Sequence, residues 1–278
     1  SDFHDVERER KHSIFTSIMH TEWRGTKINI LDTPGMPDFI GEVIPALRVC
    51  DTGLVTVHAY HGVEVGTEIV MRYLRKYNRP TIIVVNQLDH PKAEFHHTLN
   101  DLQARFRENI VVMQYPYNQG ADFNCIIDLL KMTMYKFGPD GGKPEKLPIP
   151  DDEKERANAL HNTLVEAAAE NDDSLMELFF EKGELDEDEM RKGLRAGMLN
   201  REVIPVFCTA AARNMGSGRM MGFIGNVAPS AGDMHPEETS DGGEIKVNDK
   251  NTTLFVFKTE NEKKFVETIL KRKELIKS

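Results

Sequence analysis

The sequence has few cysteines, no long apolar run and no excess of positive charge. Its three cysteines, Cys50, Cys125 and Cys208, are far apart among apolar neighbours, which excludes a disulfide framework and favours reduced thiols. No apolar run approaches the ~18 residues that cross a membrane, and no charged-then-apolar leader occurs. We therefore expect a cytoplasmic protein with no membrane partner.

The charge balance of the chain is acidic. There are 45 Asp and Glu residues against 35 Lys and Arg residues, which gives a formal net charge of −10 at pH 7. Such a surface repels a polyanion, so we expect no DNA partner, and any RNA contact requires a local basic patch. A chain of 278 residues is long enough to bury a normal core, and we expect a monomer.

Strand-like and helix-like segments alternate along the chain. Two β-rich runs, residues 13–23 and 26–32, flank Arg24-Gly25, which is typical of a hairpin turn. The further expected strands are 53–57, 81–85, 110–113 and 203–207, and the expected helices are 39–49, 69–74, 95–106 and 220–227. This alternation predicts an α/β fold with a largely parallel sheet and helices on both faces. Such sheets bind ligands at the carboxyl ends of their strands, where Asp32 and Asn86 stand.

The alternation is interrupted once and ends before the carboxyl terminus. We expect a core, an inserted α+β subdomain with charged helices, an acidic linker, and the start of a second, incomplete β domain with a lysine-rich tail. These parts are residues 1–114 and 201–235 for the core, 115–200 for the insertion, 236–250 for the linker and 251–278 for the second domain. The first strand of that second domain is predicted from Leu254 to Phe257.

Two short motifs follow expected strands. In Asp32-Thr33-Pro34-Gly35 the carboxylate can hold a magnesium-bound water, and the glycine lets the backbone approach a terminal phosphate. Four residues alone fit a plain Pro-Gly turn equally well. In Asn86-Gln87-Leu88-Asp89 the second carboxylate can accept two hydrogen bonds from the guanine ring N–H and amine, a pattern that adenine does not offer. Together the two motifs favour a guanine-nucleotide site over two ordinary loops.

With these motifs in this order, the sequence resembles the GTPase domain of translation elongation factor G over about residues 5–235. Glu9-Arg-Lys-His-Ser-Ile14 stands where the family typically reads Glu-Arg-Gly-Ile-Thr-Ile. Asp32-Thr-Pro-Gly-Met-Pro-Asp-Phe39 is similar to the family's Asp-Thr-Pro-Gly-His-Val-Asp-Phe. Pro205-Val-Phe207 with Asn214 resembles the approach to the family's last guanine loop, and Leu254 to Lys258 the start of its β-barrel domain.

The resemblance implies a P-loop-GTPase-like fold, binding of GTP or GDP with Mg²⁺, and the ribosome as partner in translocation. It assigns Ser13 and Asp32 to magnesium and Gly35 to the γ-phosphate. The nucleotide-binding residues that it implies are Asp32, Thr33, Pro34, Gly35, Asn86, Gln87, Asp89, Ala210 and Ala211. In this scheme a backbone amide of the last loop, near Ala211, meets guanine O6.

Several positions depart from the family pattern. By this alignment Met36 replaces the histidine that positions the attacking water, and a thioether is at best a weak acceptor. Losing such a group costs on the order of 10²-fold or more in rate, so hydrolysis should be slow or absent. Lys11 replaces a glycine of the first switch, Gln87 the lysine that packs over the base, and Ala210 a serine.

No Gly-x-x-x-x-Gly-Lys-Ser/Thr phosphate loop occurs in the chain; Gly141-Gly-Lys-Pro144 fails the pattern. The resemblance places that loop before Ser1, so we expect the chain to be part of a longer protein. Two alternatives stay open. One is a ribosomal protection or release-factor-3-like factor, and the other is a non-enzymatic ribosome-interaction scaffold that keeps the fold without the nucleotide.

Overall fold

A computed structural model describes residues 2–106, 109–239, 242–246, 249–250 and 253–259. The chain divides into two compact units, Ser1–Pro236 and Glu237–Ser278. The first unit holds the buried apolar core of the described residues, whose last member along the chain is Ala228. All the candidate site residues lie in this unit.

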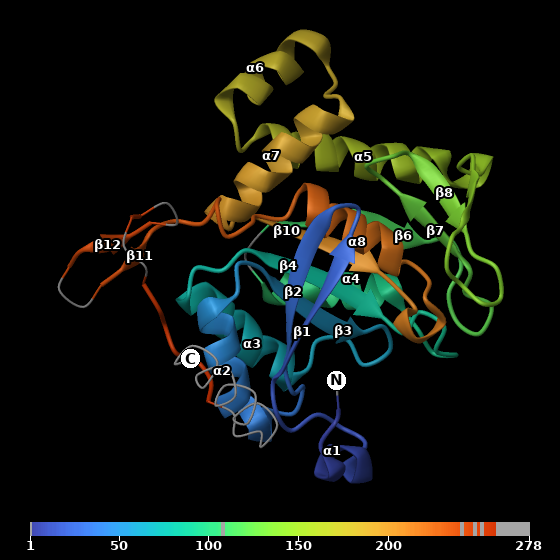
Figure 1. The fold of residues 1–278 in the computed structure, drawn as a ribbon. Coiled ribbons are helices and arrows are strands. Elements are labelled where there is room, and N and C mark those ends of the chain that lie inside the picture. The colour runs from blue at the N-terminus through green and yellow to red at the C-terminus, as the bar shows by residue number, and fades with distance from the viewer. Residues whose placement is uncertain (1, 107–108, 240–241, 247–248, 251–252, 260–278) are drawn as a thin grey trace. The chain divides into compact units, whose positions relative to one another are not determined.

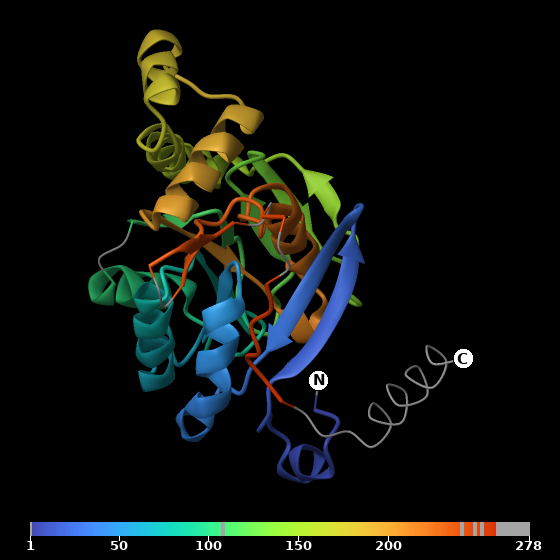
Figure 2. The same ribbon diagram turned by 60° about the vertical axis from the view of Figure 1, so that its left-hand side comes forward.

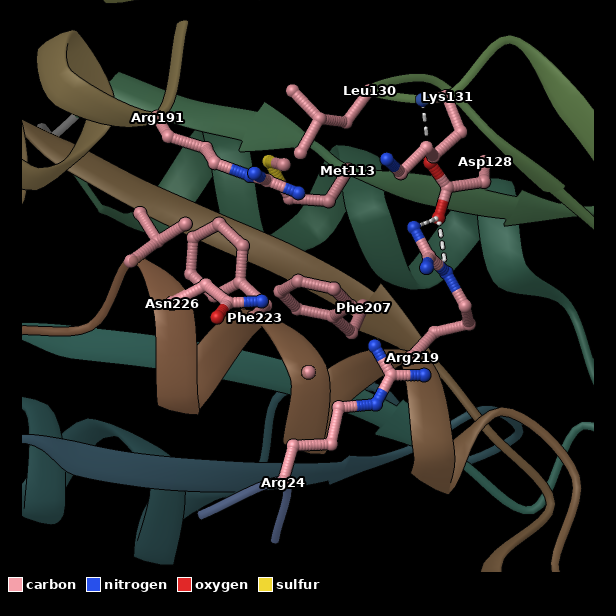
Figure 3. Close-up of a pocket in the computed structure, with 12 residues that line it drawn as sticks. Arg24, Met113, Asp128, Leu130, Lys131, Arg191, Phe207, Arg219, Phe223 and Asn226 are labelled. Carbon is pink, nitrogen blue, oxygen red and sulfur yellow. Dashed lines mark hydrogen bonds and ion pairs between the residues drawn. The ribbon is translucent and has the colours of Figure 1, made fainter. Parts of the chain in front are cut away.

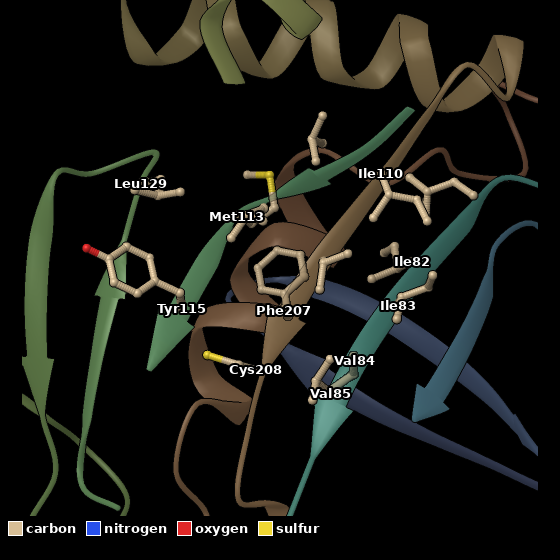
Figure 4. Packing of buried hydrophobic residues seen from close by; sticks show 14 of the residues in the cluster. Ile82, Ile83, Val84, Val85, Ile110, Met113, Tyr115, Leu129, Phe207 and Cys208 are labelled. Atoms are coloured by element: carbon tan, nitrogen blue, oxygen red, sulfur yellow. The ribbon is translucent and has the colours of Figure 1, made fainter. Parts of the chain in front are cut away.

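A four-stranded parallel sheet forms the centre of the first unit (Figure 1). Its order is β3 (Gly53–His58), β4 (Thr81–Asn86), β10 (Val203–Cys208) and β5 (Asn109–Val112). The two central strands consist almost wholly of buried residues, as continuous apolar runs in a parallel sheet should. Their side chains, among them Ile83, Val85 and Phe207, fill the core in Figure 4. The sequence-based prediction of a parallel sheet is confirmed.

Helices connect these strands and cover the sheet. They are α2 (Ile40–Val49), α3 (Val65–Lys76), α4 (Phe95–Arg105) and α8 (Ser217–Asn226). In Figure 2 the blue-to-green helices α2, α3 and α4 lie on one side of the sheet, and the orange α8 lies on the side of the β1–β2 hairpin. The helices expected from apolar spacing are therefore present, with boundaries shifted by a few residues.

The amino-terminal strands form a sheet of their own. Strands β1 (Ser17–Trp23) and β2 (Thr26–Asp32) are antiparallel around a tight turn. Arg24 and Gly25 both have positive φ, 49° and 82°, as a two-residue hairpin turn requires. Among the described strands β2 pairs only with β1, so the predicted single sheet is divided into two. The first strand also begins at residue 17 rather than 13, after a short helix α1 (Asp5–Arg10).

The insertion joins an antiparallel meander to three helices. The strands are β6 (Gln114–Pro116), β7 (Cys125–Asp128), β8 (Thr133–Lys136) and β9 (Glu145–Leu147); the helices are α5 (Lys154–Ala169), α6 (Asp173–Lys182) and α7 (Glu187–Asn200). Short 3₁₀ turns, η1 (Pro37–Phe39), η2 (Asp151–Glu153) and η3 (Ala211–Arg213), complete the unit. The charged segments near residues 152–170 and 187–198 predict α5 and α7, whereas no sequence pattern predicts α6. Asp172 and Asp186 cap the amino ends of α6 and α7 through their carboxylates.

The second unit differs from its prediction. The stretch expected to be a linker contains a short hairpin, β11 (Glu237–Glu238) with β12 (Glu244–Ile245). The predicted strand from Leu254 to Phe257 is wrong, because residues 253–259 form no strand and Leu254 is 87% exposed. Apolar alternation specifies a strand only where a partner strand and a core accept it. Most of the lysine-rich tail lies outside the described residues. No helix in the described part of the chain is long and apolar enough to cross a membrane.

Candidate functional site

Asn86 links the two loops predicted to surround guanine. It is the last residue of β4, and its side-chain Oδ1 accepts hydrogen bonds from Thr209 Oγ1 at 2.9 Å and from the Ala211 backbone N–H at 3.0 Å. Both donors follow β10, which lies beside β4 in the sheet. The structure thus brings together residues that are distant in sequence, at the carboxyl ends of two neighbouring strands.

The backbone of these loops is held by further bonds. The Leu88 N–H donates to Thr209 O at 3.2 Å, and the Gly120 N–H donates to Leu88 O at 2.7 Å. Leu88 is completely buried, whereas Gln87 is exposed and has a φ of 62°. The loop therefore presents the side chains on either side of Leu88 while its backbone is fixed.

Asp89 has a free carboxylate. It is partly buried, yet it forms no hydrogen bond or ion pair with any residue that the structure describes. A carboxylate in this state is available to a ligand that offers two adjacent N–H donors. This is the property that the predicted guanine contact needs.

The third loop differs from its expected role in one respect. Ala210 is buried and exchanges two backbone hydrogen bonds with Met215, at 3.0 and 3.2 Å. The Ala211 amide already donates to Asn86, so in this conformation it is not free for guanine O6. Thr209, which sequence analysis did not single out, closes the loop onto Asn86. A hydroxyl directly after a buried strand was the only sequence signal for it.

A cluster of histidine and tyrosine side chains adjoins the loop that follows β4, residues 87–89, which we call the base loop. His58 pairs with Asn86 across β3 and β4, and its ring lies 4.6 Å from that of His61 and 5.4 Å from that of His90. Tyr60 stacks on His90 at 5.1 Å. Burial, and then the neighbouring His61, lower the pKa of His58, while a hydrogen bond donated by the His58 ring to the Gln87 side chain opposes them. At neutral pH these effects favour a neutral His58 ring beside the base loop.

The phosphate-side motif lies between β2 and α2. Asp32 ends β2 and is partly buried, as is Thr33, while Pro34 is buried and Gly35 is exposed. A Cβ built on Gly66, in the first turn of α3, would lie 3.5 Å from the Gly35 carbonyl oxygen. Gly35 therefore lies close to α3, the helix that follows β3.

Met36 is exposed. It precedes η1, where its carbonyl accepts the Phe39 N–H at 3.0 Å, and 43% of its surface is accessible. Met36 is therefore not a buried apolar residue that fills this segment. Its side chain faces solvent and carries no group able to orient a water.

The segment before β1 is held by two glutamates that sequence analysis missed. Buried Glu7 accepts hydrogen bonds from the backbone N–H groups of Ile14 at 2.9 Å and Phe15 at 3.0 Å. Burial raises the pKa of Glu7, but these amides and that of His4 outweigh it and hold the pKa below its usual value. Glu42 of α2 accepts the Thr16 N–H at 2.8 Å. These bonds explain why β1 starts only at residue 17.

Lys11 and Ser13, which lie in the same segment, are positions where the sequence departs from the family pattern or is predicted to bind magnesium. Lys11 adopts a φ of 56°, a conformation that favours the glycine of the family pattern. Ser13 Oγ donates to Asp2 Oδ1 at 2.7 Å, while the Asp32 carboxylate has no partner among the described residues. No described group of three or more His, Cys, Asp or Glu side chains could hold a metal alone. Asp32 therefore fits a magnesium ion held mainly by nucleotide phosphates and water.

Comparison with known proteins gives consistent results. Residues 1–230 match the family model of the elongation factor Tu GTP binding domain. Elongation factor G of Thermotoga neapolitana is 35% identical over 267 residues, which cover 94% of this chain and 38% of that protein. The chain thus spans less than half the length of this relative. The crystal structure of a protein from Thermus thermophilus superimposes with a TM-score of 0.77 and 26% identity, over 83% of this chain and 34% of that one.

Proposed function

Because the chain belongs to the family of elongation factor GTP-binding domains, and within it to the elongation factor G type, we propose that it binds GTP and GDP and acts on the ribosome. The single observation that carries guanine binding is the pairing of Asn86 with the Thr209 loop, beside the unpartnered Asp89 carboxylate. In this proposal Asn86 fixes the base loop and Asp89 accepts the guanine N–H groups. Asp32 adds a ligand to nucleotide-bound Mg²⁺, and Gly35 contacts the γ-phosphate.

We further propose that GTP hydrolysis is slow. The exposed Met36 supplies no acceptor for the attacking water. The ribosome rather than hydrolysis then drives the cycle of the protein. Ribosomal translocation, a cytoplasmic location and a monomeric state are part of the same proposal, by analogy with elongation factor G.

The occupied Ala211 amide favours one alternative, a ribosome-interaction scaffold that binds no nucleotide. A ribosomal protection or release-factor-3-like role shares the Asp32-Thr-Pro-Gly35 motif. Titration of GTP and GDP with Mg²⁺, by calorimetry on this chain and on the full gene product, separates binding from no binding. The scaffold role predicts no heat of binding in either protein, together with co-sedimentation with ribosomes.

A variant that changes the preferred nucleotide tests the guanine contact more sharply than a loss of binding does, because a misfolded variant would bind no nucleotide at all. Asp89→Asn replaces one acceptor oxygen by an amide donor, which suits the C2 carbonyl of xanthine and not the amine of guanine. We expect the variant to lose GTP affinity and gain XTP affinity, each by about tenfold or more. Asp122→Asn, at an exposed position outside the base loop, serves as the matched control. Unchanged GTP affinity in Asp89→Asn would exclude the guanine contact.

A further inference from the structure

A cleft rich in arginine lies beside α8, and none of its lining residues belongs to the candidate nucleotide site (Figure 3). It has a volume of about 80 Å³, and its floor includes Phe207 and Phe223. Four cationic side chains line it, Arg24 from the hairpin turn, Lys131 from the loop after β7, Arg191 from α7 and Arg219 from α8. We refer to it as the arginine cleft.

The carboxylates near the arginine cleft do not balance its cations. Arg219 donates through Nε and Nη2 to the same oxygen of Asp128, at 2.9 and 2.8 Å. That carboxylate also accepts the Gln114 side-chain amide and the Lys131 backbone N–H, so its oxygens are fully used. Lys131 and Arg191 share Glu187, and Arg191 also donates to Asp188 at 2.8 Å. Four cations therefore face three carboxylates, in a protein whose net charge is −10.

Two donors of the arginine cleft lack an anionic partner. Arg24 forms no ion pair with a described residue, and Figure 3 shows its guanidinium reaching from the hairpin toward Arg219. The Nε–H of Arg191 is buried and has no hydrogen-bond acceptor in the described part of the chain. Buried N–H groups normally have a partner, and a bound acceptor in the cleft would supply one.

The geometry of these donors selects the ligand. The three guanidinium groups come from a hairpin, α7 and α8, and so approach the cleft from different directions. The acceptor directions of a carboxylate lie in one plane, whereas a phosphate presents oxygens around a tetrahedron and accepts from donors that approach from several directions. The apolar floor of Phe207 and Phe223 strengthens such contacts by lowering the local dielectric.

We propose that the arginine cleft is a binding site for a phosphate group. It is separate from the candidate nucleotide site, because Arg24 and Asp32 stand at opposite ends of the β1–β2 hairpin. A strand of seven residues spans about 20 Å. The lining of the cleft also includes none of the residues proposed to contact guanine, so guanine binding and phosphate binding in the cleft can be tested separately.

The chain carries its own reporter of the site. Trp23 is the single tryptophan, it precedes Arg24, and its ring lies against Gly218 of α8. Inorganic phosphate is titrated at constant ionic strength, with chloride as the comparison anion, while Trp23 emission is recorded. We expect a saturable change with phosphate only. A chloride titration that gives the same change would overturn the proposal.

Two substitutions with opposite expected effects on phosphate affinity test whether phosphate binds in the arginine cleft. Arg24→Gln should weaken phosphate binding by about tenfold, the value of one charge-assisted hydrogen bond. Arg72→Gln, the same change at an exposed position on α3, is the matched control and should have no effect. Glu187→Gln removes the carboxylate that Lys131 and Arg191 share, so it should tighten binding. Equal affinity in all three variants would refute the assignment.

The source of the phosphate is tested with a short single-stranded RNA in the same assay. If RNA binds more tightly than inorganic phosphate and Arg24→Gln abolishes the difference, the cleft takes a backbone phosphate. If RNA has no effect while inorganic phosphate binds, the cleft takes a small phosphorylated molecule. RNA binding that is insensitive to Arg24→Gln, in the absence of phosphate binding, would contradict the proposal.

Discussion

Two single residues in the segments around β1 and β2 bear on the proposed slow hydrolysis and on the shape of the loop before β1. Met36 is exposed at the start of η1, directly after the glycine proposed to contact the γ-phosphate. Glu7 is buried and fixes the backbone at residues 14 and 15. In the proposed function, residue 36 decides whether the attacking water is oriented, and Glu7 holds the shape of the loop before β1.

Met36→His should restore GTP turnover in the full gene product with ribosomes. An imidazole accepts and donates hydrogen bonds, so it can orient the attacking water, and we expect an increase on the order of 10²-fold. Met36→Leu is the control, because it keeps an apolar side chain of similar size, and it should match the unchanged protein. The measurement is release of inorganic phosphate from GTP. Equal turnover in the histidine and leucine variants would show that residue 36 does not limit hydrolysis.

The lowered pKa of Glu7 predicts that the backbone at residues 14 and 15 loosens in acid. Its pKa is lowered in the folded protein, so its stabilisation is complete above the unfolded pKa and is lost as the pH falls through the folded pKa. Hydrogen exchange at the Ile14 and Phe15 amides, measured by NMR after correction for intrinsic rates, should lose protection over that range. Glu7→Gln should lower protection at neutral pH and remove the pH dependence. A variant with the same pH profile as the unchanged protein would assign the effect to another group.

At the scale of elements, the close approach of α5 and α7 holds the insertion together. A Cβ built on Gly193 of α7 would lie 2.1 Å from the Ala168 carbonyl oxygen of α5, far inside contact distance. Glycine is required there by the neighbouring backbone rather than by its own φ. The helices can pack at this distance only without a side chain at residue 193.

Gly193→Ala should therefore destabilise the protein by about 1–3 kcal/mol, because the backbones of two helices must move apart. The matched control is Gly222→Ala in α8, where a Cβ would meet nothing within 4 Å. That change should be neutral or stabilise by up to about 1 kcal/mol through helix propensity. Urea unfolding, followed by circular dichroism, gives both values. Equal midpoints for the two variants would mean that α7 shifts without cost.

At the scale of the whole molecule, the buried core belongs to the first unit. No described residue after Pro229 is buried, and Leu254, Phe255 and Val256 are exposed. The first unit also contains the candidate nucleotide site and the arginine cleft. Stability and both binding functions should therefore be properties of residues 1–236 alone.

Removal of residues 237–278 tests this directly. We expect Tm by calorimetry to change by less than about 4 °C, the shift that roughly 1 kcal/mol causes in a domain of this size. Trp23 emission should be unchanged, since the Trp23 ring lies against Gly218 of the same unit. Truncation after residue 202, which removes β10 and α8, should by contrast abolish cooperative unfolding. A large fall in Tm on the first truncation would show that the second unit supports the core.

The sequence by itself determined the parallel sheet, most of its helices and the two nucleotide motifs, because apolar periodicity and strand-end polar residues are local signals. It missed α6 and assigned a strand to residues 254–257, where local propensity has no tertiary partner. Only the tertiary structure showed that Asn86 meets Thr209 and Ala211, that Glu7 holds the loop before β1, and that Met36 faces solvent. The arginine cleft also has no sequence signature, because its cations come from four separate segments. Such contacts depend on the packing of distant segments, which no local pattern encodes.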